Sequence, residues 1–131
     1  MDTLRHTQSI EGDLVNLEFL SDRGFDQVLD AYRPAADRLA SESGLRIALA
    51  AGLVEAALDL QGLGRETPQP AEILAGDLCL ARASRLLAET GSQRLQIAFA
   101  RVVERIAAAA AAGSPLPSTR ALLLAAIEAG A

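Results

Sequence analysis

The chain has 131 residues, of which 50% are hydrophobic and only 3% aromatic, and it carries a net charge of −5 at pH 7. This length predicts a single domain, residues 1–131, with a core of leucine, isoleucine, valine and alanine. The acidic balance and the lack of a basic patch argue against nucleic acid as a partner. A single cysteine allows no internal disulfide, which is typical of the reducing cytoplasm.

The first residues, MDTLRHTQSIEGDL, are polar, so we expect no signal peptide. No apolar run reaches the roughly 20 residues of a membrane-spanning helix, so we expect a cytoplasmic protein without a transmembrane segment. His6 is the only histidine and has no partner at metal-ligand spacing, so no metal role is expected for it. Helical spacing recurs along the chain and strand-like alternation does not, which predicts an all-α, antiparallel bundle of about six helices.

The first two helices are expected at 1–20 and 22–42. Apolar residues in the second recur at three- and four-residue spacing, which predicts an amphipathic helix. Pro34 lies inside it, and because proline lacks an N–H and crowds the preceding turn, we expect a kink or a break near Arg33. Gly44 is expected to end this helix.

The third helix, 45–61, is expected to be the central buried one, because its run IALAAGLV carries no polar side chain. Gly52 inside it suggests close helix packing, since glycine costs about 1 kcal/mol against alanine in a helix. Glu55 and Asp59 lie four residues apart on one face near its end. Two carboxylates could hold magnesium together with phosphate oxygens, but such a pair is more often plain surface charge.

A loop is expected at 62–70 and a long helix at 71–91, bounded by two prolines before it and by Gly91 after it. Arg65 in the loop is a candidate contact for a diphosphate, since the guanidinium fork matches phosphate geometry. The alternative is an ordinary solvated arginine.

The helix at 71–91 is polar on only one narrow stripe and apolar around most of its circumference. The stripe consists of Arg82, Arg85 and Glu89, and the apolar arc of Ile73, Leu74, Cys79, Leu80, Ala83, Leu86 and Leu87. This arc is wider than one neighbouring helix can cover. Gly76, Ala83 and Thr90 repeat every seven residues and leave a shallow seam for another backbone. Cys79 is expected to be a buried, inert thiol.

The last two helices are expected at 93–112 and 119–129, with Ser92 and Ser118 as their N-caps and the sequence GSPLP between them. Alanine-lined helices pack closely but bury little area each. Such a chain gains stability by sharing its apolar faces with another subunit, so we expect an oligomer.

Three segments resemble the trans-polyprenyl diphosphate synthases, and together they cover about two-thirds of the chain. Residues 73–91, ILAGDLCLARASRLLAETG, resemble the helix of that family that begins with an AGD segment. Residues 48–60 resemble the helix that carries the first aspartate-rich motif. Residues 119–131 resemble the helix that starts with a Lys-Thr pair. The resemblance implies a trimmed isoprenoid-synthase-like fold.

The chain departs from catalytic members of this family at the positions that bind magnesium and diphosphate. The first aspartate-rich motif should lie near 59–64, which read DLQGLG, so only Asp59 is acidic. The second should follow the last helix, and Thr-Arg stands at 119–120 in place of Lys-Thr. The pattern is most similar to heptaprenyl diphosphate synthase component I, a small non-catalytic subunit. It implies no catalytic residue, metal or cofactor in this chain, with magnesium bound by a catalytic large subunit.

The resemblance also implies which residues face the other subunit or the groove for the growing prenyl chain. These candidates are Gly52, Leu53, Gly76, Asp77, Leu80, Ala83 and Leu87. Asp77 would be a structural carboxylate at the subunit contact, or else a solvated aspartate on the polar edge of its helix.

Two other functions stay open from the sequence. The chain would alternatively be a homo-oligomeric helical interaction module with no role in prenyl transfer. A third reading is a self-sufficient enzyme or a carrier of apolar ligands. Too few carboxylates argue against the enzyme, since ionising a diphosphate needs several divalent-ion ligands. A carrier would show a closed apolar cavity within one subunit.

Overall fold

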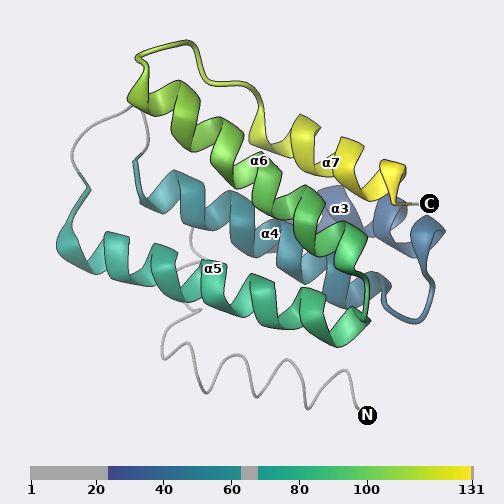
Figure 1. Ribbon diagram of the computed structural model, residues 1–131. Coiled ribbons are helices and arrows are strands. Elements are labelled where there is room, and N and C mark those ends of the chain that lie inside the picture. Colours follow the sequence, from purple (N-terminus) through teal and green to yellow (C-terminus); the bar gives the residue numbers. More distant parts are fainter. Residues whose placement is uncertain (1–23, 63–67, 131) are drawn as a thin grey trace.

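The computed structural model describes residues 24–62 and 68–130. Within these ranges the chain forms five helices and no strand: α3 (Phe25–Leu39), α4 (Gly44–Leu60), α5 (Pro70–Thr90), α6 (Gln93–Ala111) and α7 (Thr119–Ala129). Successive helices run in alternating directions and surround α4 (Figure 1). The predicted all-α antiparallel bundle is confirmed. The expected helix at 1–20 lies outside the described residues, as do His6 and Arg65.

Helix α4 is the centre of the bundle, as its apolar sequence predicts. Eleven of its 17 residues are buried, and it contacts each of the other four described helices. Four of its alanines are fully buried, and their small side chains allow the neighbouring helices to pack closely. A Cβ atom at Gly52 would lie 3.3 Å from Phe25 Cε1, so the close packing expected at this glycine is confirmed.

Of the kink or break expected near Arg33, the break is wrong, because α3 continues through Pro34 to Leu39, whereas the kink stays a prediction. Pro34 is exposed, whereas Tyr32, before it, and two alanines after it are buried in the core. Burial on both sides of the proline holds the two halves of the helix against the bundle. This tertiary packing offsets the backbone hydrogen bond that proline cannot make.

The sequence predicts that Gly44 ends the second helix, and this prediction is wrong. Gly44 is instead the first residue of α4. Helix α3 already ends at Leu39. A Cβ atom at Gly44 would lie 3.2 Å from the Cα atom of Asp37, so the start of α4 runs directly against the last turn of α3. The glycine is therefore explained by a close approach of two backbones rather than by a helix end.

Helix α5 has the ends that the sequence predicts. It begins at Pro70, where the N–H of Gln69 donates to the carboxylate of Glu72 at 3.0 Å. It is followed by Gly91, with a φ of 74° in the left-handed region that favours glycine. Another backbone comes close at Gly76, the first residue of the predicted seam, because a Cβ atom there would lie 3.2 Å from the carbonyl oxygen of Ala57 on α4.

The apolar arc of α5 is only partly covered within the chain. Cys79 and three neighbours along the inner face are buried, whereas Ile73, Leu74 and Leu78 are 43%, 62% and 41% exposed. One side of α5 therefore builds the core, and the other presents leucine and isoleucine to the outside.

The last two helices begin at the predicted serine caps. Ser92 Oγ accepts from the N–H of Leu95 at 3.2 Å, and Ser118 Oγ accepts from the N–H of Ala121 at 3.1 Å. Among the described helices, none is both long and apolar enough to cross a membrane.

Candidate functional site

A cleft of about 650 Å³ lies where α3 begins, α4 ends and α7 begins. This volume is within the range of small-molecule binding sites. Its apolar lining comes from Phe25, Val28, Ala56, Leu58, Leu60, Ile106, Leu116 and Pro117. Its polar lining comes from Glu55, Asp59, Ser118, Thr119 and Arg120.

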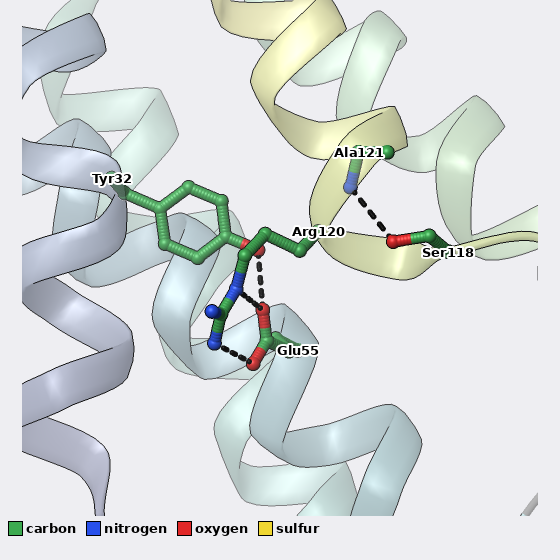
Figure 2. Close-up of polar contacts among 5 residues, drawn as sticks. All are labelled: Tyr32, Glu55, Ser118, Arg120 and Ala121. Atoms are coloured by element: carbon green, nitrogen blue, oxygen red, sulfur yellow. Dashed lines mark hydrogen bonds and ion pairs between the residues drawn. The ribbon is translucent and has the colours of Figure 1, made fainter.

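An ion pair between two of these polar residues joins α4 to α7, and a tyrosine from α3 completes it (Figure 2). Arg120 Nε and Nη2 donate to the two carboxylate oxygens of Glu55 at 3.0 and 2.9 Å. The Tyr32 hydroxyl donates to Glu55 Oε1 at 2.6 Å. Both oxygens of the carboxylate are thus engaged by one guanidinium fork, and one of them by the phenol as well.

The sequence explains why Glu55 gathers these partners. It is the only charged residue between Arg46 and Asp59 on the buried helix α4. A carboxylate that is largely removed from water needs hydrogen-bond donors, and its side chain is only 21% exposed. Tyr32 is fully buried and places its one polar atom against this carboxylate.

Tyr32 and Arg120 both keep their protons at neutral pH. Burial, and then the hydrogen bond to Glu55, raises the pKa of the Tyr32 phenol far above its ordinary value. The hydrogen bond with Glu55 also raises the pKa of Arg120. Neither group is suited to general acid–base catalysis, which needs a pKa near the working pH.

The two carboxylates expected at this end of α4 differ in their surroundings. Glu55 is tied to Arg120 and Tyr32, whereas Asp59 is exposed beside the cleft. Glu55 is therefore not the plain surface charge that the sequence suggests. In the described part of the chain, no group of three or more histidine, cysteine or carboxylate side chains is arranged to hold a metal ion.

The partnership of Glu55 with Tyr32 and Arg120 was not predicted from the sequence. The three residues come from helices that are distant along the chain, with 23 positions separating Tyr32 from Glu55 and 65 separating Glu55 from Arg120. The sequence does contain one indication, because Glu55 is a single acidic residue within the otherwise apolar middle of α4. A carboxylate in such a position needs a hydrogen-bond donor that is itself buried or half-buried.

The residues expected at a subunit contact or prenyl groove do not form one surface. Five of them are buried within the chain's own core: Gly52, Leu53, Gly76, Ala83 and Leu87. A second, smaller cleft of about 200 Å³ brings Leu80, Ala83 and Leu87 together beside α6. Val103 and Phe99 of α6 line its other wall. These three of the seven predicted residues thus share one apolar groove.

Asp77 is exposed and accepts a hydrogen bond from Gln61 Nε2 at 2.9 Å. The bond joins α5 to the residue that follows α4. Asp77 therefore contacts a neighbouring helix of its own chain, and its predicted role at a contact with another subunit stays a prediction.

Cys79 has the properties of an inert thiol, as the sequence predicts. It is 2% exposed, and burial raises its pKa to about 11. At pH 8 only about one thiol in a thousand would be ionised, so we expect the folded protein to resist a thiol reagent such as Ellman's reagent. The same chain in denaturant should react at once. Rapid reaction of the folded chain would contradict the burial of Cys79.

Comparison with known proteins adds no relative. No family model matches the chain, and neither a curated protein nor a solved structure matches it.

Proposed function

We propose that this chain is a small, catalytically silent subunit of a heterodimeric trans-polyprenyl diphosphate synthase. It docks on a catalytic large subunit, which carries both aspartate-rich motifs and the magnesium, and it helps to shape the groove for the growing prenyl chain. No metal or cofactor is assigned to the chain itself.

The observation that carries this proposal is the composition of the 650 Å³ cleft. The two positions that the resemblance assigns to functional motifs, Asp59 and Thr119–Arg120, line it together although they are far apart in sequence. Glu55, the other carboxylate there, is neutralised by Arg120. Two positions of the resemblance thus meet at a cleft in which the described residues hold one carboxylate already paired with arginine, and this arrangement supports a subunit without catalytic activity of its own.

The outward face of α5 supports the docking part of the proposal. Ile73, Leu74 and Leu78 are large apolar residues that the described chain leaves exposed. They lie on the helix that resembles the family most closely. Burying them against another subunit would remove apolar area from water, which is the main driving force for association.

Co-purification with a catalytic subunit, followed by a prenyl-transfer assay, tests the proposal. We expect the pair to co-purify and the product length or rate to change when this chain is added. Leu74→Ser with Leu78→Ser should abolish co-purification while helicity is retained. Ile97→Ser is the matched control, because Ile97 is 53% exposed on α6 instead. If the catalytic subunit makes the same product at the same rate without this chain, the proposal is wrong.

A homo-oligomeric interaction module is the second candidate, and one feature of α5 favours it. The exposed residues Ala71, Leu74, Leu78 and Ala81 are spaced three, four and three apart, so the order small–large–large–small reads the same from either end. Such a stripe is self-complementary when two copies pack antiparallel about a two-fold axis. Sedimentation of the chain, alone and mixed with the catalytic subunit, distinguishes the two candidate functions. A stable homodimer that does not bind the catalytic subunit favours the interaction module.

A further inference from the structure

Helix α7 has the fewest buried residues of the described helices, and the next is α3 with three of 15. Only Leu123 and Ile127 of its 11 residues are fully buried, whereas α4 buries 11 of 17. Helices with little buried apolar surface open at lower free energy than the core of the same protein. Helix α7 is therefore the described helix for which independent opening is best supported.

The connection before α7 permits such a movement. Residues 112–118 are not helical, and all except Pro117 are exposed. Its second residue, Gly113, has a φ of 68°, and the segment contains two prolines that cannot extend either helix. It extends away from the bundle between the end of α6 and the start of α7 (Figure 1). Among the described residues, no backbone hydrogen bonds tie this segment to the core. None therefore has to break for α7 to move away from the bundle.

The Glu55–Arg120 ion pair joins α7 to α4 at the end of α7 that borders the cleft. It is bidentate, with N–O distances of 3.0 and 2.9 Å, yet the Arg120 side chain is 45% exposed. At the opposite end of the helix, Arg38 and Glu128 approach only to 4.0 Å, and both side chains are more than 60% exposed. The first pair is the stronger of the two, because its geometry is better and its carboxylate less hydrated.

Helix α7 also forms part of the 650 Å³ cleft, since Ser118, Thr119 and Arg120 are at its start and line one wall. We propose that α7 is a latch on this cleft: it opens as a unit while α3 to α6 stay folded, and the Glu55–Arg120 pair holds it closed. Opening removes the wall and widens access to the apolar lining from α3 and α4. This inference does not depend on the proposed prenyl-synthase function.

Hydrogen–deuterium exchange on the full chain tests the latch without any substitution. Amides of 122–129 should exchange at least about tenfold faster than those at the centre of α4, because they open without global unfolding. Arg120→Gln should speed exchange in α7 a further fivefold or so and leave α4 unchanged, whereas the matched control Arg38→Gln should change α7 by less than about twofold. Equal protection of α7 and α4 in the unmodified chain would overturn the proposal, as would an equal effect of Arg120→Gln on both helices.

Tyr32 provides a second, independent measurement. It is the only tyrosine in a chain without tryptophan, so its fluorescence is not overlaid by another residue. Its hydroxyl lies against the ion pair (Figure 2). Quenching by acrylamide should increase in Arg120→Gln and stay unchanged in Arg38→Gln. Unchanged quenching in Arg120→Gln would contradict a latch held by this pair.

Discussion

Replacing Gly76 with leucine is expected to lower the free energy of unfolding by about 3 kcal/mol, although leucine is the better helix former. A Cβ atom at this position would lie 2.8 Å from Gln61 Cγ and 3.2 Å from the carbonyl oxygen of Ala57. The glutamine side chain can rotate away, but the carbonyl belongs to the backbone of α4. The two helices must then separate along their shared apolar face. Urea unfolding followed by circular dichroism measures the loss.

Ala81→Leu is the matched control for this substitution. Ala81 lies on the same helix but on its exposed side, so the added methyl groups meet no backbone. We expect its stability to change by less than about 0.5 kcal/mol. If Gly76→Leu unfolds at the same urea concentration as this control, the close approach of α4 and α5 is wrong.

Truncating Leu53 to alanine should cost about 3 kcal/mol, a large part of the roughly 5–15 kcal/mol that stabilises a typical domain. Leu53 is 1% exposed and lies in the middle of α4, the helix that contacts all four other described helices. The cost combines the lost burial of the side chain with the cavity that remains. Thermal or urea unfolding of the variant, analysed with its folded baseline, gives the value.

Leu74→Ala supplies the comparison, since Leu74 is 62% exposed on α5 and should lose less than about 0.5 kcal/mol. Comparing Leu53→Ala with Leu74→Ala also distinguishes two possible roles for Leu53. A residue that lines an open prenyl groove would change product length with little effect on stability. A core residue would destabilise the chain severely, and a small effect of Leu53→Ala would therefore contradict its place in the core.

Both large effects arise where α4 is packed against its neighbours. Substitutions at Gly76 and Leu53 change folding, so they cannot isolate an effect on partner binding. The outward side of α5 separates the two, because Leu74 and Leu78 are exposed. Tests of partner binding are therefore most informative with substitutions at these two leucines.

From the amino-acid sequence alone one can predict the all-α class, the central position of α4, both ends of α5 and the serine caps of α6 and α7. These features follow from local causes. A capping serine binds an N–H three residues away, a glycine after a helix adopts a left-handed conformation, and an unbroken apolar run must be buried wherever it lies.

Three features become visible only in the packed bundle: the continuity of α3 through Pro34, the close approach at Gly44, and the contacts of Tyr32, Glu55 and Arg120 beside one cleft. Each depends on how the helices meet in the packed bundle, and Tyr32, Glu55 and Arg120 in particular are 23 and 65 positions apart along the chain. The effect of a proline or a glycine on a helix depends on the residues packed around it, which the sequence does not identify. A lone glutamate in an apolar helix predicts a hydrogen-bond partner but does not indicate which residue it is. The free energy that settles these points comes from packing and from long-range hydrogen bonds, which local sequence does not encode.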